Sequence, residues 1–247
     1  MKKVNRVLAV LILLVILAGI IVALHFRRDI PMIPWSDDTI EEFLVEKIDM
    51  EAEMKEMGES NGSQDVFYST ASDLEQKSSI LVLASPTGKR EVFQESILTE
   101  LEVSNILKNE NDRPIQDHIL VFEPIAVNLW GKVLSLKSPL NLMLRGKEYI
   151  LCLNFYEKPE NYHLKDIEQS MYLLSNPYIG IIPLEDPPSS VYLPTGDTNP
   201  SYHEIMDYAY VFSNDSEETL YLTLRENFIK LIAELSPRDP LSVRGQE

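Results

Sequence analysis

Apolar and polar positions follow three different patterns along this chain of 247 residues. A continuous apolar run occupies Val7–Leu24 and is interrupted only by Gly19. From Ser79 to about Leu184 apolar residues recur at every second position, which is typical of strands, and near the C-terminus they recur every three or four, which is typical of a helix. The pattern therefore predicts an α+β protein with an apolar N-terminal segment.

The apolar N-terminal run is long enough to cross a bilayer. At a rise of ~1.5 Å per residue a helix over Val7–Leu24 extends about 27 Å, close to the ~30 Å hydrocarbon core. A cleaved signal peptide is the alternative, but the run exceeds the usual ~7–15 residues and Ile21–Leu24 is a poor cleavage site. Three basic residues precede the run and two arginines follow it, which slightly favours an internal N-terminus. We expect an uncleaved single-pass signal anchor within residues 1–28.

Residues 29–63 are predicted to connect this anchor to a folded domain. The first part contains two prolines and Trp35, and reads as a stiff spacer. Trp35 could lie at the headgroup level or be buried by the domain. Ser36–Met57 is predicted to be an acidic helix that ends at Gly58, because four apolar residues share one face: Ile40, Phe43, Leu44 and Ile48.

Residues 64–235 are predicted to form one β-rich domain. Ile97, Thr99 and Leu101 alternate with Leu98 and Glu100, as in a half-buried strand. The other candidate strands are Ile80–Ala84 (ended by Pro86-Thr87-Gly88), His118–Phe122, Val133–Leu136, Tyr149–Phe155, Met171–Leu174 and Tyr178–Ile182. Short strands with frequent turns predict a small antiparallel β-barrel or sandwich with flanking helices.

A loop-rich stretch, Glu185–Ser201, separates these strands from a closing helix. Asp215 and Glu218 have the spacing of a capping box at its start, and Ser236-Pro237 ends it. The helix is expected to pack through an apolar stripe made of Leu220, Leu224, Phe228, Leu231 and Leu235. Residues 236–247 are expected to be a disordered tail.

The middle of the chain is similar to a known group of proteins. The strand Ser79–Ala84, the long strand Ile97–Leu107 and the turn Arg145-Gly146-Lys147 before a hydrophobic strand carry the resemblance, over residues 79–155. In these features the chain resembles uncharacterised membrane-anchored or secreted proteins of Gram-positive bacteria. Their extracytoplasmic domain is an OB-like barrel, broadly like that of metalloprotease inhibitors. The resemblance implies an OB-like fold and an extracytoplasmic location, and it brings no catalytic residue.

The charge of the chain argues against nucleic acid as a partner. Five of the 22 basic residues and none of the 39 acidic ones lie within residues 1–28. Residues 29–247 therefore carry 17 basic against 39 acidic groups, a net charge of −22. Such a domain is repelled by phosphate backbones and by anionic headgroups.

Candidate chemistry is sparse. The single cysteine, Cys152, lies in an apolar strand and is expected to be a buried thiol, and no intramolecular disulfide is possible. His203-Glu204-Ile205-Met206-Asp207 has the spacing of a zinc-protease motif, but Asp replaces the second His, so an ordinary polar turn is favoured. His118 and His163 stand alone. The sequence predicts no catalytic, metal or cofactor residue.

Two kinds of function remain open. Adjacent acids such as Glu41-Glu42 and Glu217-Glu218 suit solvated helix starts, although a glycosidase pair would come from distant positions. Tyrosines are concentrated in the second half of the chain, where they indicate packing or a carbohydrate- or protein-binding face. We expect a membrane-anchored, extracytoplasmic, non-catalytic interaction module of a bacterial envelope. The alternative is an envelope hydrolase that uses carboxylates or a metal.

Overall fold

The computed structural model divides the chain into two compact units, Met1–Ile33 and Pro34–Glu247. The residues it describes are 15–16, 19, 33–35, 40–48, 70–93, 95–110, 113–155, 167–185, 188–193 and 199–235. Among them, none of the helices combines the length and the apolar character that a membrane span needs. Most of the predicted anchor Val7–Leu24 lies outside these residues. The acidic segment after Ile48 and the tail 236–247 lie outside them completely.

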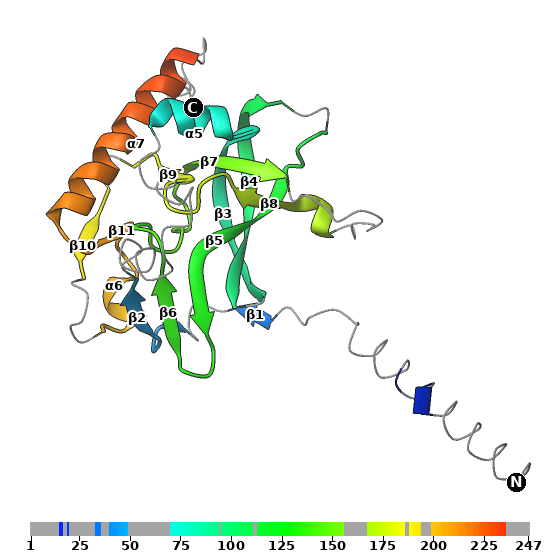
Figure 1. Ribbon diagram of the computed structural model, residues 1–247, viewed down its shortest axis with the longest axis vertical. Coiled ribbons are helices and arrows are strands. Elements are labelled where there is room, and N and C mark those ends of the chain that lie inside the picture. Colours follow the sequence, from blue (N-terminus) through cyan, green and yellow to red (C-terminus); the bar gives the residue numbers. More distant parts are fainter. Residues whose placement is uncertain are drawn as a thin grey trace, which may run out of the picture. The chain divides into compact units, whose positions relative to one another are not determined.

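The larger unit is built on three long antiparallel strands, β3 (Ile80–Phe93), β4 (Ser96–Asn109) and β5 (His118–Asn128), shown in Figure 1. The predicted strands in this region are confirmed, but they extend further. Pro86–Gly88 does not end the first strand. It causes an irregularity in the β3–β4 register, and Gly88 adopts a φ of 92°, which glycine tolerates.

Two more strands join the ends of this meander into a ring. β7 (Tyr149–Phe155) pairs antiparallel with β3 and with β8 (Met171–Leu174), and β8 pairs parallel with β5. The parallel pairing is short, Leu120 with Met171 and Val121 with Tyr172. β9 (Ile181–Pro183) continues outward beside β7. The predicted strands Tyr149–Phe155 and Met171–Leu174 have the observed bounds, and the α+β class is confirmed.

The segment between the two predicted domains contributes strands rather than a long helix. β1 (Ile33–Trp35) adjoins β3, and β2 (Leu44–Lys47) pairs parallel with β6 (Val133–Leu136). The prediction of one helix over Ser36–Met57 is therefore wrong at residues 44–47. Leu44 and Val45 are β-compatible residues, and Val45 gains a buried position and a hydrogen bond from its N–H to the Pro200 carbonyl (2.8 Å).

The stretch predicted to be loop-rich contains one strand of a second, small sheet. β10 (Ser190–Tyr192) pairs parallel with β11 (Tyr210–Phe212), and the short helix α6 (Tyr202–Ile205) lies between them in sequence. The two strands are only three residues long, so neither contains enough alternation to be read from the sequence.

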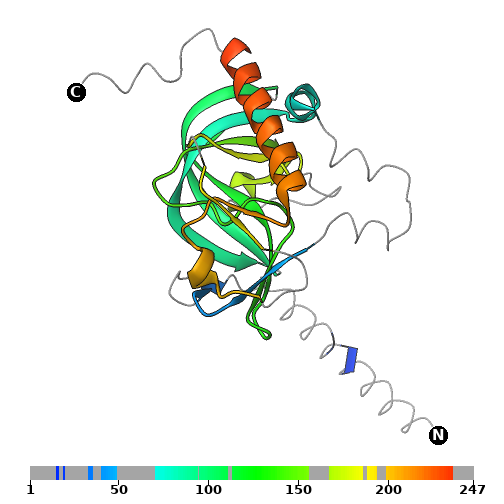
Figure 2. The same cartoon turned by 90° about the vertical axis from the view of Figure 1, so that its left-hand side faces the viewer.

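Two helices lie side by side outside the ring, α5 (Ala71–Lys77) and α7 (Asp215–Leu235), as Figures 1 and 2 show. The predicted closing helix is confirmed, but its buried face is rotated by one residue. The side chains of Tyr221, Arg225, Phe228 and Ile232 are buried, whereas Leu220 is 46% exposed. The cap at its start also differs from the predicted pair of Asp215 and Glu218. The Asn214 side chain accepts a hydrogen bond from the Glu217 N–H (2.9 Å).

The interior contains two apolar clusters with a buried ion pair between them. The helix-side cluster includes Leu81, Leu101 and Val121, and the hairpin-side cluster includes Val92 and Ile125. Between them along β3, β4 and β5 lie three polar side chains that are at most 7% exposed: Arg90, Thr99 and Glu123. Arg90 Nε lies 3.1 Å from Glu123 Oε1, and Glu123 also accepts hydrogen bonds from the Thr99 hydroxyl and the Met143 N–H.

Candidate functional site

The predicted zinc-like motif does not gather ligands. His203 is on the short helix α6, 69% exposed, and its Nδ1 lies 3.8 Å from a Glu41 oxygen. Asp207 lies beyond the helix, and its carbonyl accepts a hydrogen bond from Ser189. Within the described parts of the chain no three His, Cys, Asp or Glu residues are arranged to hold a metal. His163 lies outside the described residues.

The other sequence candidates have structural roles. Cys152 is fully buried, as predicted, and burial raises the pKa of its thiol. Glu217 accepts hydrogen bonds from the Ser213 N–H (2.6 Å) and the Tyr178 hydroxyl (2.7 Å) and pairs with Lys47 (3.1 Å). Most tyrosines that the structure describes in the second half of the chain pack inside the domain, because five of them are buried: Tyr149, Tyr172, Tyr202, Tyr210 and Tyr221.

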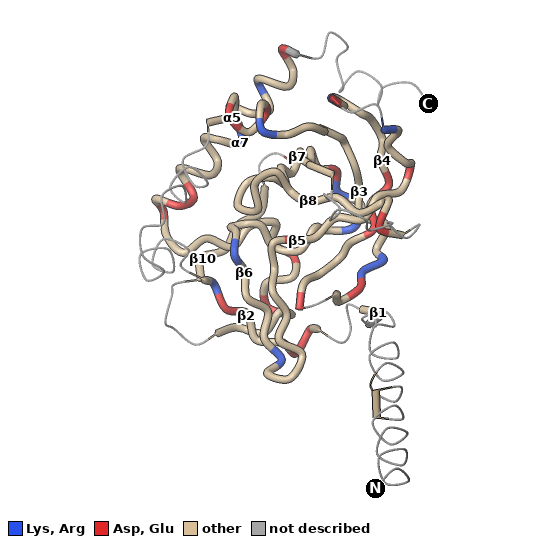
Figure 3. Tube along the Cα trace, turned by 45° about the vertical axis from the view of Figure 1, so that its right-hand side comes forward, with Lys and Arg blue, Asp and Glu red and all other residues tan. Residues whose placement is uncertain are grey.

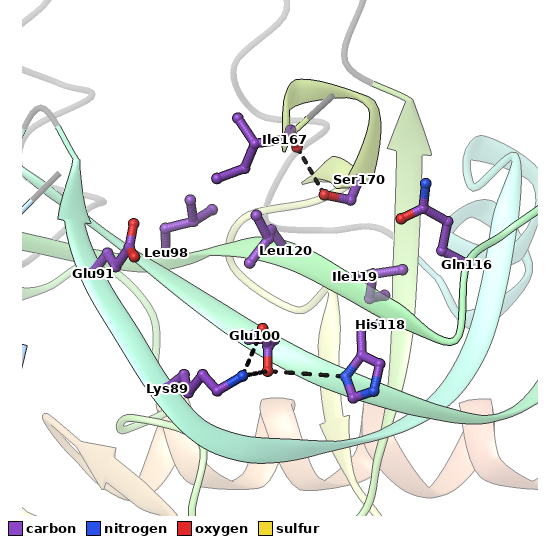
Figure 4. A pocket seen from close by; sticks show the side chains of 10 residues that line it. All are labelled: Lys89, Glu91, Leu98, Glu100, Gln116, His118, Ile119, Leu120, Ile167 and Ser170. Atoms are coloured by element: carbon purple, nitrogen blue, oxygen red, sulfur yellow. Dashed lines mark hydrogen bonds and ion pairs between the residues drawn. The ribbon is translucent and has the colours of Figure 1, made fainter. Parts of the chain in front are cut away.

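One histidine candidate does line a hollow. His118 opens β5, and the hollow lies on the outer face of β3, β4 and β5, with about 260 Å³ of space. The 3-10 helix η1 (Ile167–Ser170) forms its opposite wall. Its lining is Lys89, Glu91, Leu98, Glu100, Gln116, His118, Ile119, Leu120, Ile167 and Ser170 (Figure 4).

Strand alternation places these side chains together. Because successive side chains of a strand point to opposite faces, Lys89 and Glu91 of β3 face outward while Arg90 faces the interior. On β4 and β5 the register pairs Glu100 with Leu120 and Glu102 with His118. Outward side chains that are nearly thirty residues apart in the sequence, such as Lys89 and His118, thus lie on one surface.

One side of the hollow is a polar row. Lys89 Nζ lies 3.0 Å from Glu100 Oε1, the Thr87 hydroxyl donates to the same oxygen (3.0 Å), and His118 Nδ1 lies 3.9 Å from it. Figure 4 shows Glu100 between Lys89 and His118. Acidic positions recur along β4 on the outside of the domain (Figure 3).

The other side is apolar. Leu120 lies between the polar row and η1, where Ile167 is 41% exposed (Figure 4). Leu98, beside Glu91, is buried. Further along the same face, Phe93 and Phe122 pack with ring centroids 6.0 Å apart. The hollow therefore offers a charged rim beside an apolar wall, in which Ile167 is exposed and Leu120 is half-buried.

The acid of the polar row is held as a carboxylate. Burial alone acts to raise the pKa of Glu100, but hydrogen bonds from Lys89 and Thr87 outweigh it and lower the pKa below its ordinary value. The Ser170 hydroxyl donates to the Ile167 carbonyl (2.7 Å), so it is not aligned with His118 as a nucleophile. The polar row thus holds a negative charge between Lys89 and His118.

Comparisons with known proteins found no family model, no curated protein and no solved structure that matches this chain. The hollow itself was not predicted from the sequence. The alternation over residues 97–104 indicated that Leu98 and Glu100 share the outward face of a strand. Which strands flank that face depends on long-range pairing, which local patterns do not encode.

Proposed function

We propose that this chain is a membrane-anchored, extracytoplasmic, non-catalytic interaction module of a bacterial envelope that binds a protein partner in the hollow over β3, β4 and β5. The observation that carries the proposal is the hollow itself, in which the polar row of Lys89, Glu100 and His118 faces the apolar wall of Leu120 and Ile167.

The topology supports an OB-like interpretation of the ring. Its strands follow the order β3-β4-β5-β8-β7 and return to β3. The parallel pair is β5 with β8, which are the third and the fifth of these strands along the chain. OB-folds bind their ligands on the face of the second and third strands and on nearby loops. The hollow lies over the corresponding strands, β4 and β5, and is closed by η1 just before β8.

The membrane attachment rests on the apolar run Val7–Leu24, whose length matches a bilayer span, and on the basic residues at its ends. The single buried cysteine fits an envelope domain that relies on an ordinary core. With the N-terminus inside, protease added to protoplasts is expected to remove the folded domain. Protection of residues 34–247 would instead indicate a cytoplasmic domain.

The chemistry of the hollow favours a polypeptide segment. The strongly acidic domain disfavours nucleic acid, and the residues lining the hollow include no phenylalanine, tyrosine or tryptophan on which a sugar could stack. A carboxylate, an ammonium group and an imidazole beside leucine and isoleucine side chains match a segment that carries both polar and aliphatic side chains. A space of about 260 Å³ accommodates a few such side chains.

In-cell photocrosslinking tests this proposal. A photoreactive residue at Gln116, on the exposed rim, is expected to form a defined adduct with a protein, and one at Glu226, on the exposed face of α7, is not. Glu100→Lys, which reverses a charge in the polar row, is expected to diminish the Gln116 adduct. Equal adducts from both positions, or a Gln116 adduct unaffected by Glu100→Lys, would contradict a binding role for the hollow.

A further inference from the structure

An exposed apolar group lies at one end of the Pro34–Glu247 unit. Trp130, in the connection between β5 and β6, is 101% exposed, which means that its whole side chain faces solvent. Leu129 beside it is 39% exposed and Leu44 at the start of β2 is 46% exposed. We call these three residues the Trp130 tip. Large apolar side chains so exposed at one place commonly mark a contact with another surface.

The tip is held by hydrogen bonds. The Asn128 side chain accepts the Gly131 N–H (2.8 Å), and the Lys132 carbonyl accepts the Leu44 N–H (2.9 Å). A Cβ at Gly131 would lie 3.0 Å from the Asn128 amide nitrogen, so a larger residue there would displace the Asn128 side chain slightly. Lys132 has a φ of 52° and pairs with Glu42 (3.2 Å). Trp130 is therefore presented outward by a defined turn.

The tip also lies where the chain enters this unit. Trp35 packs against Phe43 with ring centroids 6.3 Å apart, and Leu44, the next residue, hydrogen-bonds to Lys132, two residues after Trp130. Nine residues, 25–33, separate the predicted anchor from Pro34. Even fully extended they reach at most roughly 30 Å, at ~3.3–3.6 Å per residue. An anchored chain thus keeps the end that carries the tip close to the bilayer.

We propose that the Trp130 tip inserts into the headgroup region of the bilayer to which the chain is anchored. This inference rests on the proposed membrane attachment. Tryptophan is enriched at membrane interfaces because its large ring is apolar while its N–H stays hydrated. The net charge of −22 on residues 29–247 opposes electrostatic adsorption, so the insertion depends on the apolar side chains and favours zwitterionic lipid.

Such an insertion would fix the orientation of the binding hollow. A single connection allows a domain to rotate above the membrane, whereas a second contact point at the tip restricts that rotation. The hollow over β3, β4 and β5 would then keep a constant orientation relative to the membrane, which favours a partner on the same membrane.

Tryptophan fluorescence of the full chain provides the test. The chain has two tryptophans, so Trp35→Phe leaves Trp130 as the single reporter. Trp35 Nε1 is buried without a hydrogen-bond partner, so this substitution removes no hydrogen bond. The variant is reconstituted into phosphatidylcholine vesicles with or without bromine on the upper acyl chain. We expect the Trp130 emission to shift to shorter wavelength, and we expect the brominated vesicles to quench most of its intensity.

A matched reporter defines the control. The triple variant Trp35→Phe, Trp130→Phe, Ile106→Trp moves the tryptophan to an exposed position of β4 near the other end of the ring, and its emission should be insensitive to bromine. Retention of the chain in the vesicles without quenching of Trp130 would overturn the insertion and leave the anchor standing. A blue shift that depends on protein concentration, without quenching, would assign the tip to a second copy instead. Release of the chain from vesicles by alkaline washing would overturn both proposals.

Discussion

Arg90 and Glu123 lie where the core of the ring would otherwise be continuous. Their charges are desolvated by both apolar clusters, but each charge compensates the other. Glu123 also accepts hydrogen bonds from Thr99 and the Met143 N–H, and Arg90 donates one to the Met143 carbonyl. Desolvation of a buried pair often cancels its Coulomb attraction, so its net effect on stability is small. The loss of one partner has a much larger effect, because it leaves a charge buried alone.

Glu123→Leu is therefore expected to destabilise the 34–247 unit by about 3–5 kcal/mol, a large fraction of the ~5–15 kcal/mol typical of a domain. The double variant Arg90→Met, Glu123→Leu should recover most of that loss. Denaturant unfolding followed by circular dichroism measures both. If the double variant is as unstable as the single one, the pair contributes through specific geometry rather than through charge compensation.

Glu100 gives a second prediction at this scale. Because its pKa is lower in the folded protein than the ordinary 4.5, its stabilisation is complete above the unfolded pKa and is lost as the pH falls through the folded pKa. Glu100→Gln should therefore cost stability near neutral pH and progressively less below about pH 4.5. Unfolding free energies measured from about pH 6 to about pH 3 test this. A difference between the two proteins that stays constant with pH would contradict it.

At the scale of elements, α7 covers the open edge of the sheet. Among the described strands β9 is the last on the path of the sheet, and its carbonyls accept hydrogen bonds from side chains of α7. The Tyr221 hydroxyl donates to Ile181 O (3.0 Å), and the Arg225 guanidinium donates to Pro183 O (3.0 Å) and to Glu185 O. This explains why an arginine occupies the buried face of the helix, and it blocks pairing of the edge with another chain.

Phe228→Ala tests the docking of this helix. Phe228 is fully buried in the helix-side cluster, so the substitution should cost about 3–5 kcal/mol, or roughly 6–20 °C of melting temperature. Glu226→Ala, on the exposed face of the same turn, should change the melting temperature by little. Thermal melting followed by circular dichroism measures both. Equal melting temperatures for the two variants would show that α7 is not held by this face.

Elements were predictable where the pattern is local. The strands 133–136, 149–155 and 171–174 alternate or stay apolar between clear turns, and their bounds agree with the prediction. β2 was misread because Ile40, Phe43 and Leu44 have helical spacing, while its pairing with β6 involves residues far along the chain. The rotation of the α7 stripe has a similar cause, since Arg225 is buried only through its bonds to β9.

For the whole molecule, the fold class follows from local patterns, whereas the site depends on pairing between residues far apart in the chain. Alternation indicates a β-rich domain, and it assigns Leu98 and Glu100 to the outward face of β4. The hollow, however, needs β3, β5 and η1 beside that face, and those neighbours follow from ring closure through β7 and β8. No residue in the hollow has a chemical motif of its own, so its position in the fold is the only signal.

Cys152 provides a prediction on the ring as a whole. It lies on β7 between β3 and β9, so its sulfur becomes accessible only when the ring opens. The native protein is expected to resist a thiol reagent, since burial both shields the thiol and raises its pKa, and to react once denatured. The rate of labelling should rise in Phe228→Ala and remain unchanged in Glu226→Ala. Fast labelling of the native protein would contradict closure of the ring.

The pairing of β2 with β6 has a consequence for biosynthesis. β2 is made early, but its partner strand follows roughly 90 residues later, and translation adds about 5–20 residues per second. The hydrogen bond from Val45 to Pro200 forms later still. An emerging chain therefore carries an unpaired, partly apolar strand for several seconds. During that interval the exposed strand makes the nascent domain prone to aggregation.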